Sequence, residues 1–147
     1  MIIMLAVLVV AVQQEPLIQL RLARKTPAPG FVLTKSIADS TLYVASRIIL
    51  EDAGIQQART AATTDGVVLT IRLTRAAATR LNESTKGHTG WRLAIFASGQ
   101  LNSAGVIKQE LRVGAESPIT LAIHLPQPAA EQFAAAVAAR WPARDAR

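Results

Sequence analysis

The chain has 147 residues, which is enough for one domain with a single hydrophobic core. Its formal net charge is +6, but the basic residues are scattered and do not alternate with aromatic side chains, so we expect no nucleic-acid partner. The absence of Cys excludes disulfides, thiolate nucleophiles and Cys-ligated metals.

Residues 1–12 stand apart because the run from Ile2 to Val12 is apolar without interruption. It is shorter than the roughly 20 apolar residues that a transmembrane helix needs, and it has the length of the apolar region of a secretory signal peptide. No Lys or Arg precedes it. Three interpretations therefore stay open, namely a signal peptide, a membrane anchor and a buried first strand. If the segment is cleaved, we expect the mature chain to begin near residues 12–14.

Residues 13–40 are predicted to hold an N-terminal strand followed by a loop. The stretch from Leu17 to Ala23 alternates apolar and polar residues, which is typical of a half-buried strand. Pro27, Pro29 and Gly30 then indicate a loop. Two short strand candidates follow, at 31–34 and 41–45.

The stretch from Leu50 to Thr60 is predicted to be a helix. Glu51 and Asp52 would lie in its first turn, where negative charge favours the helix dipole, although Gly54 weakens the pattern. The β-branched segment from Val67 to Leu73 is the strongest strand prediction in the chain.

The next segment is predicted to be a helix and then a hairpin. Thr74 is a good N-cap for a helix that ends at Gly87. A strand from Trp91 to Ala97 would turn at Ser98-Gly99 into a second arm. Residues 106–112 are ambiguous between a strand and a short helix.

The last two predicted elements are a strand and a helix. Ile119 to Leu125 alternates cleanly, and apolar residues recur at helical spacing from Pro128 to Trp141, before a tail at 143–147. Phe133 and Val137 should contact the final strand, and Arg140 should lie off that face. The pattern predicts a single α+β domain with a mixed, mostly antiparallel sheet and helices packed on one face.

No arrangement of polar residues indicates catalysis or metal binding. The two histidines, His88 and His124, do not stand at the spacing of a ligand pair, and Ser98 and Ser103 have no His base or orienting acid nearby in the sequence. We therefore expect no catalytic residue, no cofactor and no metal, and predict that the chain is not an enzyme.

One motif-bearing stretch resembles a known module. The run Leu93-Ala94-Ile95-Phe96-Ala97-Ser98-Gly99 is similar to a Leu-Ala-Ile-Val-Leu-Asp-Gly strand, and residues 103–107 follow it as a Ser-Ala-Pro-x-Ile stretch follows that strand. Ser98 stands for the usual Asp and Gly105 for the Pro. On these residues, 41–142 resembles the head subdomain of the first periplasmic domain of the SecD/SecDF family of protein-export subunits.

The resemblance implies an exported, non-catalytic domain in the periplasm or on the outer face of the cytoplasmic membrane. It implies contact with unfolded polypeptide or with the export machinery, and contact with the membrane only through an uncleaved N-terminal segment. The predicted polypeptide contacts are Trp91, Phe96, Leu101, Val106 and Ile107. The alternative is a structural or regulatory interaction domain of unknown partner that has lost the export role.

Overall fold

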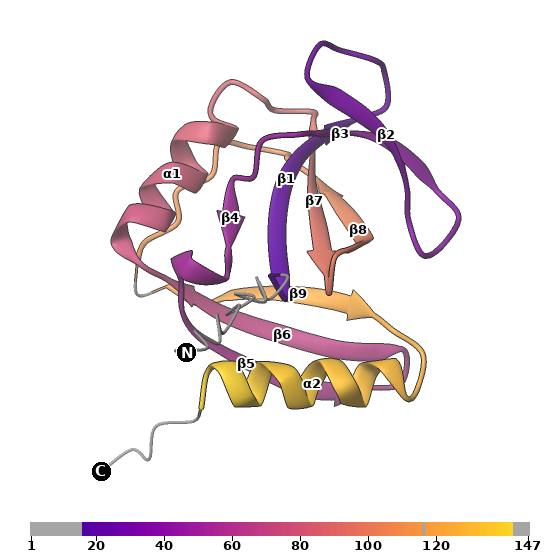
Figure 1. The fold of residues 1–147 in the computed structure, drawn as a ribbon. Coiled ribbons are helices and arrows are strands. Elements are labelled where there is room, and N and C mark those ends of the chain that lie inside the picture. The colour runs from indigo at the N-terminus through magenta and orange to yellow at the C-terminus, as the bar shows by residue number, and fades with distance from the viewer. Residues whose placement is uncertain (1–15, 116, 143–147) are drawn as a thin grey trace, which may run out of the picture.

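The computed structural model of the chain describes residues 16–115 and 117–142, so the predicted segment at 1–12 and the tail at 143–147 lie outside the described residues. The described strands and helices, in chain order (Figure 1), are β1 (Ile18–Arg24), β2 (Phe31–Lys35), β3 (Thr41–Ala45), β4 (Leu50–Glu51), the 3-10 helix η1 (Asp52–Gly54), β5 (Ile55–Thr63), β6 (Gly66–Leu73), α1 (Arg75–Thr85), β7 (Arg92–Ala97), β8 (Gln100–Val106), β9 (Ile119–His124) and α2 (Ala129–Arg140).

The first sheet has the strand order β2-β3-β1-β7-β8. On one side β1 pairs with β7 along most of its length, and on the other side it pairs with β3 near Ala23 and with β4 near Leu20. The sheet therefore runs across the boundary predicted at residue 41, because β1 and β2 belong to it. β2 and β8 are its two edge strands.

The second sheet has the order β5-β6-β9, and every pairing described in either sheet is antiparallel. The strongest predicted strand becomes β6, the centre of this sheet, and Leu69, Ile71 and Leu73 on it are completely buried. The α+β class predicted from the sequence is confirmed, with the strands divided between two sheets.

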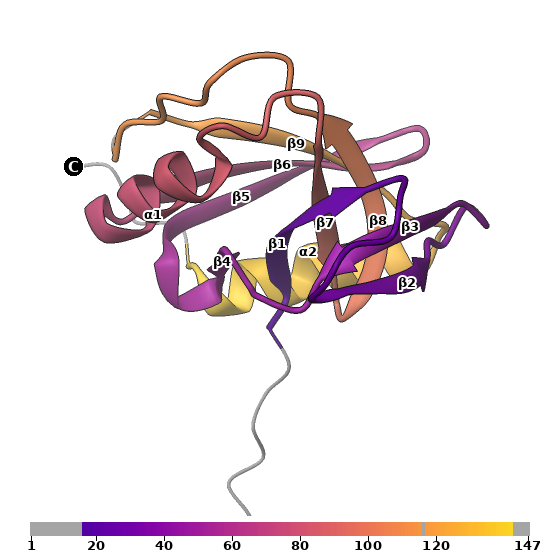
Figure 2. The same ribbon diagram turned by 90° about the horizontal axis from the view of Figure 1, so that it is seen from above.

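The main core lies where the two sheets face each other and the helices. Strand alternation sends Leu20 and Ile95 of the first sheet into this core, while Ala23 and Phe96 of the same strands point to the opposite side, termed here the outer face. α2 packs on β5 and β6 (Figure 1) and buries Phe133 and Val137, whereas α1 packs on β4 and β6. Viewed from above, α1 and α2 lie in different parts of the molecule and do not overlap (Figure 2).

Two helix boundaries follow the sequence prediction closely. The Thr74 hydroxyl accepts a hydrogen bond from the Ala77 N–H at 3.2 Å, so Thr74 caps α1. Pro128 directly precedes the first residue of α2, and the helix ends before Trp141. The Ser98-Gly99 turn is also confirmed, and both residues have positive φ, at 50° and 80°, as a tight hairpin of the I′ type requires.

The helix predicted from Leu50 to Thr60 is wrong, because this stretch forms β4, η1 and β5. The helical pattern there was weak, and pairing with the β-branched strand β6 outweighs it. Gly54 lies where η1 meets α1. A Cβ atom at this position would lie 2.8 Å from the Cβ of Ala77 on α1, so only glycine allows η1 and α1 to approach so closely.

Asp52 and Arg140 also differ from the prediction. The Asp52 carboxylate does not start a long helix but accepts hydrogen bonds from the N–H groups of Leu17 and Ile18, both at 2.9 Å. Arg140, expected to lie free of the packed face, forms an ion pair with Asp52, and both side chains are largely buried. The carboxylate therefore joins the start of β1 to the end of α2.

Replacing Phe133 tests the docking of α2. Phe133→Ala removes a large buried side chain and leaves a cavity, so the free energy of unfolding should fall by about 3–5 kcal/mol. Gln132→Ala, an exposed neighbour on the same helix, should change it by less than about 0.5 kcal/mol. Urea melts of both variants measure the difference. Equal midpoints would contradict the docking of α2 on the second sheet.

Replacing Gly54 tests the close approach of η1 to α1. In Gly54→Ala the added methyl group would meet the Cβ of Ala77, which cannot move without the helix, so we expect a loss of about 1–3 kcal/mol. Gly105→Ala on β8 is the matched control, because a Cβ there meets nothing within 4 Å, and its stability should stay within about 1 kcal/mol of the parent. Equal melting temperatures for the two variants would show that Gly54 is not required by the close approach of η1 and α1.

Candidate functional site

The five predicted polypeptide contacts gather on the β7–β8 hairpin and its flanks, but they differ in exposure. Phe96, Leu101 and Ile107 are buried, so their side chains pack inside the protein. Trp91 is half-buried, and Val106 is 47% exposed at the end of β8. Of the five, Trp91 and Val106 are therefore the ones that reach solvent, and contact of any of them with polypeptide stays a prediction.

Trp91 is held by neighbours around its indole ring. Phe31 and His88 pack against it edge to face, with ring centroids 5.7 Å and 4.4 Å from its own. The Arg24 guanidinium stacks over the same ring at 4.6 Å and donates from Nε to the Thr26 hydroxyl at 3.1 Å. These contacts place a fixed cation beside a fixed aromatic at one end of the first sheet.

The open edge of the first sheet at β2 is the most exposed apolar feature among the described residues. Val32 and Leu33, side by side on this edge strand, are 59% and 57% exposed. β2 pairs with β3 alone, so backbone N–H and C=O groups along its other side have no strand partner. An exposed apolar edge strand is a template for pairing with a further strand.

A groove of about 380 Å³ lies beside this edge on the outer face of the first sheet. The groove is lined by residues of β1, β2, β3 and β7 and of the turns next to them, namely Pro16, Gln19, Arg21, Val32, Thr34, Val44, Ser46, Phe96 and Gly99. The Arg21 guanidinium lies 5.2 Å from the centre of the Phe96 ring and donates to the Gln19 side chain at 3.0 Å. The Arg21 Nε atom is buried without a hydrogen-bond partner among the described residues. The groove thus combines an apolar floor with one fixed cation.

The turn between β2 and β3 crosses the outer face and reaches β8. The Ile37 N–H donates to the Leu101 carbonyl at 3.0 Å, and the Ser36 hydroxyl accepts from the N–H groups of Ala38 and Ser40. Beneath it, Asn102 joins the two sheets, because its amide donates to the His124 carbonyl at 2.7 Å and accepts from the His124 N–H at 3.0 Å. These contacts hold the edge, the turn and the hairpin in one arrangement.

The sequence analysis missed the β2 edge. The sequence predicts a short strand at 31–34, but the predicted polypeptide contacts all lie on or beside the β7–β8 hairpin, which carries the family-like motif. The signal was present in consecutive apolar residues, Val32 and Leu33, because in a strand with one buried face such neighbours cannot both be buried. What the sequence could not show is that β2 would be an edge.

The described residues offer no group of three or more His, Asp or Glu side chains that could hold a metal ion. The same residues contain no helix with the length and apolar character needed to cross a bilayer. The described surface has an open strand edge beside grooves, and such an edge can accept an added strand.

The fold of this chain matches two structures of the protein-export component SecDF. One is a crystal structure of SecDF in its super-membrane-facing form, with a TM-score of 0.54, 17% identity and coverage of 82% of this chain and 18% of that one. The other is a structure of SecDF described as a membrane component that enhances protein export, with a TM-score of 0.54, 18% identity and coverage of 82% and 61%. At these identities the likeness concerns the fold.

The family model of the SecDF P1 head subdomain matches residues 31–139. The chain therefore belongs to the SecDF P1 head family, which confirms the family indicated by the motif at 93–107. The chain spans 18% of the SecDF chain in the super-membrane-facing structure. A comparison with curated proteins gives no significant match.

The Asn102 contact can be tested by truncation. Asn102→Ala leaves the N–H and C=O of His124 without their partner beside a buried side chain, so the free energy of unfolding should fall by about 1–3 kcal/mol. Ser103→Ala, the adjacent residue on β8, is the control and should change stability by less than about 0.5 kcal/mol. Chemical denaturation distinguishes them, and a neutral Asn102→Ala would mean that this amide does not join the sheets.

Proposed function

We propose that the chain is a non-catalytic accessory domain of protein export that holds extended polypeptide at the open edge of β2. The proposal depends on the two exposed apolar side chains of this edge, Val32 and Leu33, of which Val32 lines the groove over Phe96. A bound segment would add a strand to the first sheet through main-chain hydrogen bonds, and every second side chain would enter the groove.

Main-chain pairing suits a partner without fixed sequence. Backbone N–H and C=O groups are the same in every polypeptide, so affinity from strand addition does not depend on which chain is bound. The groove would add a weak apolar preference mainly through the exposed Val32, because Val44 and Phe96 in its floor are almost fully buried. Sequence-independent pairing and a weak apolar preference are expected of a domain that binds many different unfolded chains.

Export and location are part of the same proposal. One matching SecDF structure is of a membrane component that enhances protein export, and this chain belongs to the family of its P1 head. We place the domain on the outer side of the cytoplasmic membrane, in the periplasm, with the export machinery as its partner. The apolar run at residues 2–12 supports export of the chain.

A titration followed by nuclear magnetic resonance tests the contact. Full-length protein is mixed with a short, uncharged peptide in which Val alternates with Thr, and backbone amide shifts are followed. We expect saturable shifts centred on β2 and on the groove residues, and weaker binding, by about tenfold, in Val32→Ser/Leu33→Ser, because two exposed apolar contacts are removed.

Ala76→Ser, at an exposed position on α1, which packs on β4 and β6, is the matched control and should bind the uncharged peptide as the parent does. Val106→Ser changes the exposed apolar residue of the other edge strand, β8, and should weaken binding less than the β2 variant does. If Val106→Ser weakens binding and the β2 variant does not, the contact lies at β8, where the sequence analysis placed it. If the peptide does not bind at millimolar concentration, the domain is better explained as a structural or regulatory interaction domain.

A further inference from the structure

Two adjoining grooves lie at the end of the first sheet where β1 ends. Both are lined by Lys25 and Arg92. The larger, of about 610 Å³, runs from the β2–β3 turn to β8, and the smaller, of about 340 Å³, lies beside Trp91. Arg24 lines the smaller groove as well. The two together, with Arg24, Lys25 and Arg92, are termed here the basic groove.

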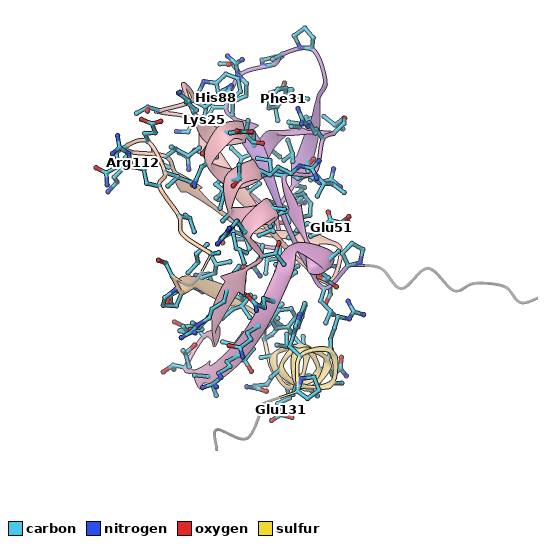
Figure 3. The ribbon with its side chains drawn as sticks, turned by 90° about the vertical axis from the view of Figure 1, so that its left-hand side faces the viewer. Lys25, Phe31, Glu51, His88, Arg112 and Glu131 are labelled. Carbon is cyan, nitrogen blue, oxygen red and sulfur yellow. The ribbon has the colours of Figure 1, made fainter. Side chains whose placement is uncertain are left out.

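No carboxylate lines the basic groove. Neither Lys25 nor Arg92 forms an ion pair with a described residue, and Arg24 is engaged by Trp91 and Thr26 instead. Asp39, on the β2–β3 turn, is paired with Lys35 at 3.0 Å. Asp65 lines a neighbouring hollow, which shares Ala38, Asn102 and His124 with the larger groove. Figure 3 shows Lys25 at the same end of the molecule as Phe31 and His88, with Glu51 and Glu131 farther away.

Arg24 and Arg92 are positioned by neighbouring residues, whereas the Lys25 side chain is exposed. Arg24 is fixed by its stack on Trp91, whose ring is itself held by Phe31 and His88. Arg92 is half-buried on β7, with its backbone paired to Ala23 of β1 and Val106 of β8. Fixed cations without counter-charges attract an anionic group at little cost in side-chain entropy.

The remaining lining identifies the class of anion. Ser103, Ala104 and Val106 of β8 line the grooves, and β8 pairs with β7 on one side only. A polypeptide can use both the cations and the edge of β8 beyond Leu101, whose carbonyl already accepts the Ile37 N–H, whereas a phospholipid headgroup can use the cations alone. Nucleic-acid bases would need an open aromatic face, but Arg24 already covers the Trp91 ring.

We propose that the basic groove selects acidic segments of the polypeptides that the domain meets. Carboxylates of an extended segment would face Lys25 and Arg92 while its backbone lies along β8. The inference rests on the proposed polypeptide contact and adds to it a chemical preference and a second edge. The preference should weaken as ionic strength rises, because the cations stay in contact with solvent.

Fluorescence anisotropy with two labelled peptides tests the preference. One alternates Glu with Val, and the other carries Gln in place of each Glu. The full chain should bind the Glu peptide about three- to tenfold more tightly than the Gln peptide at low ionic strength, as expected for two exposed ion pairs. Lys25→Gln/Arg92→Gln should remove this difference and leave the affinity for the Gln peptide unchanged.

Arg72→Gln/Arg80→Gln is the matched control, because it removes two exposed charges from β6 and α1, away from the grooves. It should keep the preference for Glu. Equal loss in the two double variants would assign the effect to net charge and overturn the site. Binding of the Gln peptide without any preference for Glu overturns this inference alone, whereas binding of neither peptide overturns the proposed function too. Sedimentation of the chain with anionic phospholipid vesicles, abolished by Lys25→Gln/Arg92→Gln, would overturn the choice of polypeptide.

Discussion

The Asp52 carboxylate lies where the first sheet, the second sheet and α2 meet. Asp52 itself follows β4 of the first sheet and precedes β5 of the second. Its oxygens accept the N–H groups of Leu17 and Ile18 at the start of β1 and pair with Arg140 at the end of α2. Each partner is charged or is a backbone donor that would otherwise be left unpaired, so the contacts are of the stronger, charge-assisted kind.

The end of the first sheet opposite this junction carries the basic groove. The strand β1 begins at Ile18, which donates to Asp52, and ends at Arg24, beside Trp91 and the basic groove. The two open edges, β2 and β8, run along the same sheet and are linked by the β2–β3 turn through Ile37 and Leu101. In the proposed function, a polypeptide segment would meet apolar side chains at β2 and positive charge beside β8. The Asp52 contacts hold the opposite end of the same sheet.

The sequence predicted the elements with strong local signals. Val67–Leu73, the capped helix after Thr74, the Ser98-Gly99 hairpin and the final helix are each marked by residue types within a few positions, and the structure has each of them. The helix prediction after Leu50 is wrong because the stretch pairs with β6, from Ile55 with Leu73, 18 positions along the chain, to Thr60 with Leu69, 9 positions along it. Local charge at Glu51 and Asp52 suggested a helix start, whereas the partners of Asp52 come from residues 35 and 88 positions away.

The candidate site was predictable in part for the same reason. The β7–β8 hairpin could be found by its motif, but the exposure of its side chains depends on strands distant in the sequence, which bury Phe96 and Leu101. Lys25 and Arg92 are 67 positions apart, and only the pairing of β1 with β7 brings them to one groove. Composition shows an excess of basic residues, and it does not show that carboxylates are missing from one surface.

The most direct test of the account is the stability of Asp52→Ala measured together with hydrogen exchange at Leu17 and Ile18. We expect a loss of about 2–4 kcal/mol, because two backbone donors and Arg140 lose a common acceptor, with faster exchange of both amides. Glu51→Ala, the exposed neighbour, should change stability by less than about 0.5 kcal/mol and leave the exchange unaltered. An Asp52→Ala variant that matched Glu51→Ala in both measurements would contradict the role of this carboxylate as the junction of the fold.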